Sequence, residues 1–171
     1  MMSRNRVRPE AGWVNQSKLA RGPNGRALCR WCGVEVPKGR RTFCSEPCVH
    51  HHKLRSDPGY VRRLVFQRDK GVCAACGLDT HELKTKLARL YFRDRYAELE
   101  RLGFPTHRET YWDADHVVPV AEGGGECDLD NYRTLCLRCH REATAELMAR
   151  LAARRQPAES YPLFDDADTS A

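Results

Sequence analysis

Eight of the nine cysteines fall into four closely spaced pairs, and this spacing limits the possible folds more than any other feature of the sequence. Three pairs have two intervening residues and one pair has three. Two such pairs together supply the four thiolates of a closed, tetrahedral zinc site. We therefore predict two structural zinc sites, one formed by Cys29, Cys32, Cys44 and Cys48 and the other by Cys73, Cys76, Cys136 and Cys139.

The two quartets would constrain the chain differently. Cys44 and Cys48 have the spacing of about one helical turn. In the second quartet the pairs lie far apart in sequence, so zinc would join them and couple metal binding to folding. The alternative for each quartet is a set of reduced core cysteines, which the coincidence of metal-type spacings disfavours. One histidine of the run 50–52 could replace Cys48 as a ligand, although a surface cluster or a phosphate contact is the preferred interpretation.

Composition indicates that the zinc sites supplement a modest core. The chain has 171 residues, of which 41% are hydrophobic, and a mean hydropathy of -0.67. This length suits one domain with a small appended module. The sequence has no N-terminal signal-like apolar run and no stretch of about 18 apolar residues. We therefore expect no membrane association and an intracellular, reducing location, where paired cysteines bind zinc rather than form disulfides.

Positive charge is concentrated in the N-terminal part of the chain. Residues 1–70 contain 16 Lys and Arg against 5 Asp and Glu, whereas residues 71–171 contain 13 against 18. A basic segment of this kind suits a polyanionic partner such as nucleic acid, because cationic side chains displace the counterions of phosphates. A solvated basic surface is the alternative.

Local patterns predict a small, zinc-stabilised α+β chain. We expect a flexible basic arm over residues 1–26, a zinc module over 27–56, a larger domain over 57–155 and a disordered acidic tail over 156–171. Asp57 and Pro58 predict the start of a helix that ends near Asp69. Leu83, Leu87, Leu90 and Tyr91 predict a second helix over residues 80–102, with a charged opposite face. Strands are expected over 111–118 and 132–135, and a helix from Cys139 with an apolar stripe at Ala145, Leu147, Met148 and Leu151.

Residues 113–140 hold a concentrated set of polar groups. Asp115 and His116 are adjacent, three glycines follow at 123–125, and Asn131 and His140 come after them. In this order, and with the run from Asn131 to His140, the segment resembles the HNH endonuclease family over residues 60 to 150. More loosely, the chain from Cys29 onward is similar to the HNH domain at the C-terminus of some eukaryotic annealing helicases.

The resemblance implies a ββα-metal core within residues 57–155 and a role for each motif residue. Asp115 and His140 would hold one catalytic divalent ion, Mg²⁺ or Mn²⁺. His116 would be the general base, since a neutral imidazole can take a proton from water near neutral pH. Asn131 would position the loop that bears the base. A regular strand places Asp115 and His116 on opposite faces, so a local turn or bulge would be needed to bring them together.

We therefore expect a metal-dependent endonuclease that hydrolyses the phosphodiester bonds of double-stranded or branched DNA. Two alternatives stay open: a zinc-dependent nucleic-acid-binding module without catalysis, and a nuclease subunit active only in a larger complex. The sequence does not identify protein partners. Five basic residues are candidate DNA contacts: Arg40, Arg41, Arg133, Arg138 and Arg141.

Overall fold

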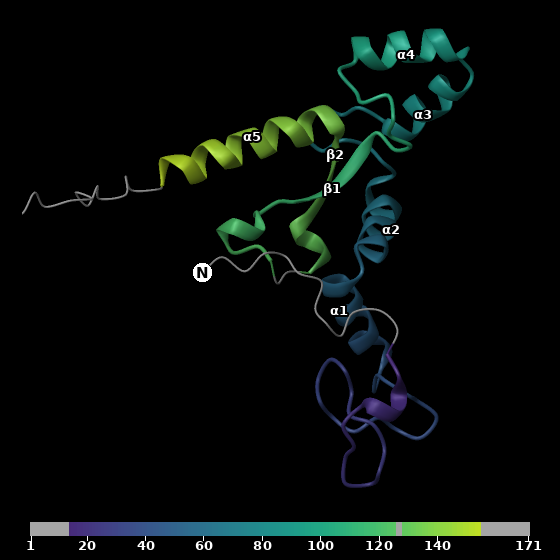
Figure 1. Ribbon diagram of the computed structural model, residues 1–171, viewed down its shortest axis with the longest axis vertical. Helices are drawn as coiled ribbons and strands as arrows, with labels where there is room; N and C mark the ends of the chain where they lie inside the picture. Colours follow the sequence, from purple (N-terminus) through teal and green to yellow (C-terminus); the bar gives the residue numbers. More distant parts are fainter. Residues whose placement is uncertain (1–13, 126–127, 155–171) are drawn as a thin grey trace, which may run out of the picture.

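The computed structural model describes residues 14–125 and 128–154 (Figure 1). At its centre lies a two-stranded antiparallel sheet formed by β1 (Trp112–His116) and β2 (Tyr132–Cys136). Trp112 pairs with Cys136 and His116 pairs with Tyr132, without a bulge between them. Helices α2 and α5 pack against this hairpin, which confirms the expected small α+β fold (Figure 1).

Helix α2 (Pro58–Asp69) covers one face of the sheet. The Asp57 side chain caps it by accepting a hydrogen bond from the Tyr60 backbone N–H at 2.9 Å, and Pro58 opens the first turn as the sequence predicted. Val61 and Val65 are buried against Trp112. Asp57 is also the residue that ends α1 (Glu46–Ser56), so a single extended residue joins the two helices.

Helix α5 (Leu137–Ala153) begins two residues before the predicted start. Its first turns lie on the opposite face of the hairpin, where His140 approaches Asp113 and Asp115. The expected apolar stripe is not buried: the Met148 side chain is 62% exposed. The 17-residue helix is longer than the five-residue strand that it packs against. Its second half therefore projects beyond the sheet (Figure 1).

The single helix expected over residues 80–102 is wrong, because the segment forms α3 (Thr80–Ala88) and α4 (Phe92–Arg101). In one straight helix, Leu87 and Leu99 would be about 18 Å apart along the axis. The break lets both enter the same core cluster, where each is only 1% exposed. Leu90 and Tyr91, expected on the buried face, are exposed instead. Among the described residues, no helix has the length and apolarity needed to cross a membrane.

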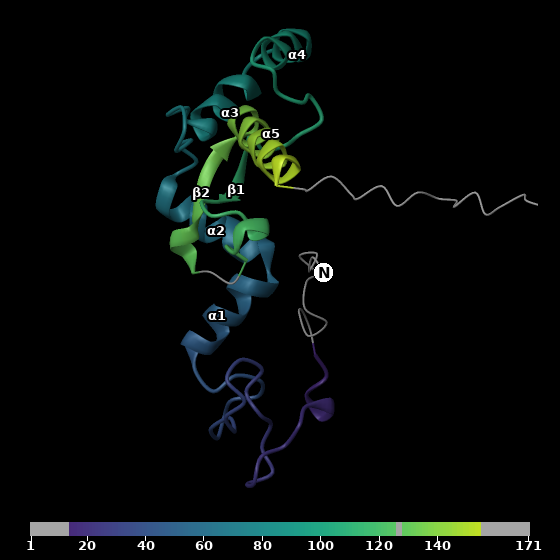
Figure 2. The same ribbon diagram turned by 90° about the vertical axis from the view of Figure 1, so that its left-hand side faces the viewer.

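The N-terminal module lies at the end of the molecule opposite α3 and α4 (Figure 2). Its core contains Ala27, Cys29, Val36 and Cys48, with Leu19 packed against it. The backbone N–H of Leu28 also donates to Ala20 at 2.8 Å. Residues 14–26, expected in a flexible arm, are thus held by the module because Leu19 gains an apolar site there. Residues 1–13 and the expected acidic tail from residue 156 lie outside the described residues.

Candidate active site

Two carboxylates on β1 converge on one histidine at the start of α5. Asp113 and Asp115 are two residues apart, so they lie on the same face of the strand. An oxygen of Asp113 lies 3.6 Å from Nδ1 of His140, and an oxygen of Asp115 lies 3.7 Å from Nε2. Each ring nitrogen of His140 therefore faces a different carboxylate.

Arginines hold both carboxylates in place. Arg62 of α2 donates to Asp113 at 2.7 Å, and Arg108 donates to the same oxygen at 2.8 Å. Arg133, on the paired strand, donates through Nε and Nη2 to Oδ2 of Asp115 at 3.1 and 3.0 Å. The other Asp115 oxygen is the one that faces His140. These bonds hold the two carboxylates in fixed orientations.

His116 ends β1 and lies on the other face of the strand from Asp115. No bulge brings the two together, since the pairing is regular up to His116 and Tyr132. The His116 ring packs against the Tyr132 ring with a centroid distance of 4.4 Å. Burial of the ring lowers the pKa of His116, and the nearby Asp115 charge opposes this only in part. The imidazole is therefore held in its neutral form at neutral pH.

A cavity of about 370 Å³ brings the two faces together. Its lining includes His116, Asp113 and His140, although they come from different faces and elements. Arg55, from the end of α1, also lines it. The Arg55 guanidinium lies 4.6 Å from the Trp31 ring centroid, and its Nε and Nη1 are buried without a hydrogen-bond partner in the described chain. Helix α1 thus contributes a positive charge to this cavity.

The loop between the strands is fastened by Asn131. Its side-chain oxygen accepts from the Val118 backbone N–H at 2.7 Å, and its amide nitrogen donates to the carbonyls of Val118 at 3.0 Å and Gly124 at 3.1 Å. A Cβ atom at Gly124 would lie 1.7 Å from the Val118 carbonyl oxygen, so only glycine fits. Glu122 in the same loop pairs with Arg150 of α5 at 3.2 Å.

Both cysteine quartets are assembled as the spacing predicted. In each quartet the four sulfurs lie within 4.8 Å of one another, which suits a metal ion. The Cys32–Cys44 and Cys44–Cys48 sulfur distances are 3.5 and 3.4 Å. Cys48 lies in α1, whereas Cys44 precedes the helix. The two are therefore not one turn apart on a helix, although their spacing predicted this. All eight of these cysteines are free thiols.

Backbone N–H groups favour the ionised form of one thiol in each quartet. Burial raises the pKa of Cys29, but backbone donors at Cys32, Cys44 and Trp31 outweigh it and lower the pKa to about 6. At Cys73 burial also raises the pKa, but backbone N–H donors outweigh this effect and lower the pKa to about 7. A thiolate is the form that binds metal, so the turns themselves prepare the sites.

The five candidate DNA-contact arginines lie in different surroundings. Arg40 pairs with Glu46, Arg133 with Asp115, and Arg141 donates to the Gly103 carbonyl. Arg41 and Arg138 are exposed and have no salt-bridge partner in the described part of the chain. The last two are therefore the ones free to meet a phosphate without breaking an existing contact.

The histidine run does not form the expected surface cluster. His50 lies 2.7 Å from the Tyr60 hydroxyl, His51 stacks on Trp31, and His52 is buried against Phe43. These rings pack α1 against the module and the start of α2. Cys48 completes its quartet without a histidine.

Sequence reasoning missed the groups that support the site. Arg62 and Arg108 bind Asp113, and Arg55 reaches the cavity, yet no local pattern marks any of them. Tyr132 is the first residue of the predicted strand 132–135 and could have been found as the partner of His116 once the strands were paired.

Comparisons with known proteins agree with this geometry. A family model described as HNH endonuclease matches residues 103–146. The DNA annealing helicase and endonuclease ZRANB3 of Mus musculus is 33% identical over 161 residues, covering 81% of this chain. The protein of the same name from Homo sapiens is 35% identical over 129 residues, covering 67% of this chain. The chain spans only 15% of the mouse protein and 12% of the human one.

One solved structure is also similar to part of the chain. The crystal structure of the human ZRANB3 HNH domain is 35% identical and covers 59% of this chain and 98% of that chain, with a TM-score of 0.47. The family model spans β1, the loop, β2 and the start of α5, which are the elements that carry the converging carboxylates and histidines. The family-model match over these elements, together with the identity to the curated relatives, assigns residues 103–146 to the HNH endonuclease family.

Proposed function

We propose that this protein is a metal-dependent endonuclease that hydrolyses phosphodiester bonds in DNA. The observation that supports it most directly is the convergence of Asp115 and His140 beside a cavity that His116 also lines. A carboxylate and an imidazole that can hold a metal ion, beside a second imidazole that can take a proton, are the groups that hydrolysis of a phosphodiester requires.

The donor set fits a hard divalent ion. Bonds of about 2.0–2.2 Å from an oxygen and from a nitrogen together exceed the 3.7 Å between Asp115 and His140 Nε2, so one ion can contact both. Asp113, opposite Nδ1, would orient the imidazole as carboxylates do behind many histidine ligands. Mg²⁺ or Mn²⁺, when bound, would neutralise charge that develops on the phosphate.

His116 would act as the general base. Its lowered pKa keeps the ring neutral, so it can accept a proton from the attacking water. Asn131 would be a positioning residue, because its bonds to Val118 and Gly124 hold the backbone that follows the base. Arg55 would bind a substrate phosphate, which would supply partners for its guanidinium.

We propose zinc for both cysteine quartets, since four thiolates close a structural site with no open position. DNA is proposed as the substrate because the relatives are named as a DNA annealing helicase and endonuclease. The basic N-terminal segment supports the same choice, because it would neutralise phosphates beside the cavity. A reducing, intracellular location remains a prediction from the sequence.

Replacement of His116 by alanine tests the catalytic proposal. The variant should fold and bind DNA, but its cleavage of plasmid DNA should fall by about 10²–10⁴-fold, as is typical when a general base is lost. His81→Ala is the matched control, because His81 is exposed and lies outside the cavity. His140→Ala should instead raise the concentration of divalent ion needed for half-maximal cleavage.

The assay should compare side-by-side preparations in Mg²⁺, Mn²⁺ and Ni²⁺, to exclude a contaminating nuclease. Equal cleavage by wild type and His116→Ala in every ion would end the nuclease proposal. The zinc-dependent nucleic-acid-binding module would then take its place.

A further inference from the structure

Large apolar side chains are exposed where α3 gives way to α4. The Tyr91 side chain is 69% exposed, and Phe92 and Tyr96 are each 49% exposed. We call these three residues the aromatic tip. Aromatic side chains are normally buried, because each hides a large apolar area. Three exposed rings within six residues, in a chain with a modest core, therefore mark a binding surface.

The tip is surrounded by positive charge. Residues 84–96 contain five Lys and Arg and one acidic residue, Asp94. The Arg93 guanidinium lies 5.8 Å from the Phe92 ring centroid. Basic side chains interleaved with aromatic rings are the combination that proteins use to bind single-stranded nucleic acid.

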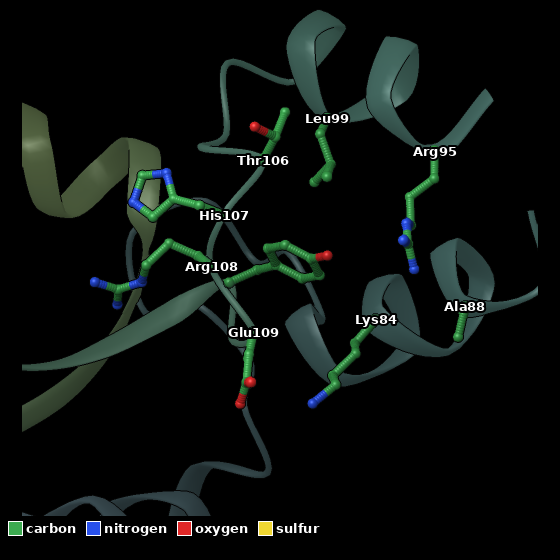
Figure 3. A pocket seen from close by; sticks show the side chains of 9 residues that line it. Lys84, Ala88, Arg95, Leu99, Thr106, His107, Arg108 and Glu109 are labelled. Atoms are coloured by element: carbon green, nitrogen blue, oxygen red, sulfur yellow. The ribbon is translucent and has the colours of Figure 1, made fainter. Parts of the chain in front are cut away.

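A cavity of about 340 Å³ lies beside the tip, between α3, α4 and the segment that leads into β1 (Figure 3). Lys84 of α3 and Arg95 of α4 line it, and neither has a salt bridge within residues 14–125 or 128–154. Arg108 also lines the cavity but is already bound to Asp113. Glu109 is the one carboxylate in the lining, so two free cations face one anion.

We propose that the aromatic tip binds the unpaired bases of a DNA strand by stacking, while Lys84 and Arg95 bind the phosphates of that strand. This inference rests on the proposed function only in taking DNA as the polyanion. Bases within a duplex are already stacked on one another, so the exposed rings can serve only bases that are unpaired.

Other occupants fit the surface less well. The centre of a protein–protein interface is depleted in charged residues, whereas five cationic residues lie within the segment 84–96 that contains this tip. A second copy of the chain would bring the same net positive charge against itself across a two-fold interface. A polyanion with exposed ring faces satisfies both the charge and the apolar rings.

The test measures binding and leaves cleavage aside. Proteins carrying His116→Ala are titrated, in fluorescence anisotropy, against labelled oligothymidylate and against a duplex of equal length. Adding Phe92→Ala and Tyr96→Ala should weaken single-strand binding by at least about 5-fold, the effect of losing one stacked base. Duplex affinity should change by less than about 2-fold, because the duplex offers the tip no ring faces.

Two controls match the variant. Phe92→Tyr with Tyr96→Phe keeps both rings and should retain single-strand affinity. Met148→Ala removes another exposed apolar side chain, far along α5, and should have no effect. Lys84→Gln with Arg95→Gln should make the logarithmic salt dependence of single-strand binding shallower by about 1.4, as expected for two phosphate contacts.

The results of these binding experiments distinguish base stacking from the alternative roles of the aromatic tip. Equal loss on single strand and duplex, or no loss on either, would overturn the stacking role. Self-association in sedimentation that the alanine pair abolishes, with single-strand binding intact, would assign the tip to a second copy. Tip-dependent binding in a wild-type protein that cleaves nothing would leave this inference standing and remove only the nuclease.

Discussion

Gly124 shows how one residue without a side chain can control the site. Its carbonyl accepts from Asn131, and its α-carbon approaches Val118 so closely that a Cβ would overlap the Val118 carbonyl. The Val118 N–H donates to the Asn131 side-chain oxygen, and the Val118 carbonyl accepts from the Asn131 side-chain nitrogen. The absence of a side chain at Gly124 therefore allows the loop to pack against Val118, two residues after His116 at the end of β1.

Gly124→Ala should both destabilise the fold and reduce cleavage. The added methyl group must displace Val118, which should lower the free energy of unfolding by about 1–3 kcal/mol and loosen the backbone next to His116. Thermal unfolding and plasmid cleavage measure the two effects. Gly125→Ala is the matched control, because a Cβ there meets only the movable Val120 side chain at 3.1 Å. Identical behaviour of the two variants would show that the close approach is unimportant.

The motif residues could be predicted because they lie in one short stretch of chain. His116, Asn131 and His140 fall within a hairpin and the helix that follows it, so their order and spacing already carry their arrangement. Arg62 could not be predicted in the same way. It meets Asp113 across 51 residues of sequence, and only the packing of α2 on β1 brings the two together. Arg133 was expected on DNA, but strand pairing places it opposite Asp115.

Among the elements, the end of α2 and strand β2 are joined by a polar contact. The Asp69 carboxylate accepts hydrogen bonds from the Thr134 N–H at 3.1 Å and from the Thr134 hydroxyl at 2.9 Å. Thr134 is fully buried. Arg68 bonds to Asp69 and to the Tyr132 carbonyl at 2.6 Å. The helix thus holds the strand through two neighbouring side chains.

Asp69→Ala should lower the free energy of unfolding by about 1–3 kcal/mol, because it leaves the buried Thr134 donors without a partner. Hydrogen bonds from Arg68, more than those from Thr134, lower the pKa of Asp69 in the folded protein despite its partial burial. A lowered folded pKa stabilises the fold above the unfolded pKa of about 3.9. The difference between wild type and variant should therefore be full at pH 7 and shrink as the pH falls below about 4.

Urea unfolding across this pH range measures the effect. Asp94→Ala is the control, since Asp94 has no salt bridge in the described chain and should show no such trend. A wild-type advantage that grows towards low pH would contradict the assigned interaction.

The break between α3 and α4 shows why periodicity alone failed for this segment. Leu83, Leu87, Leu90 and Tyr91 have helical spacing, which is a local property. The chain instead turns at residues 89–91 because Leu99 gains more by joining Leu87 in the core than Leu90 loses by exposure. That comparison depends on tertiary packing, which no local pattern reports. Helix α2 was predictable because Asp57 and Pro58 fix its start within the sequence itself.

In the whole molecule, the two cysteine quartets stabilise different bodies. The first closes the N-terminal module, whose core includes Cys29 and Cys48. The second joins the turn at Cys73 to the start of α5, and Cys73, Cys136 and Cys139 all belong to the main core cluster. Loss of the first ion should therefore affect only the N-terminal module, whereas loss of the second should affect the main core.

Purified protein should contain two zinc ions per chain, and elemental analysis yielding one or none would contradict this. Cys29→Ser should lose one ion and disorder only the module, whereas Cys136→Ser should unfold the main core, because structural zinc contributes directly to folding. Circular dichroism and the zinc content of each variant measure these outcomes. Equal loss of structure in the two variants would show that the bodies do not fold separately.

The single residue between α1 and α2 has a consequence for how this chain can vary. Cys48 is fixed in its quartet, and Arg55 reaches the cavity from the same helix. Every residue added to α1 between them would turn Arg55 by about 100° and advance it by about 1.5 Å. The orientation of the N-terminal module relative to the cavity therefore depends on the number of residues between Cys48 and Arg55. Insertions in α1 between Cys48 and Arg55 can preserve this orientation only when they add whole helical turns.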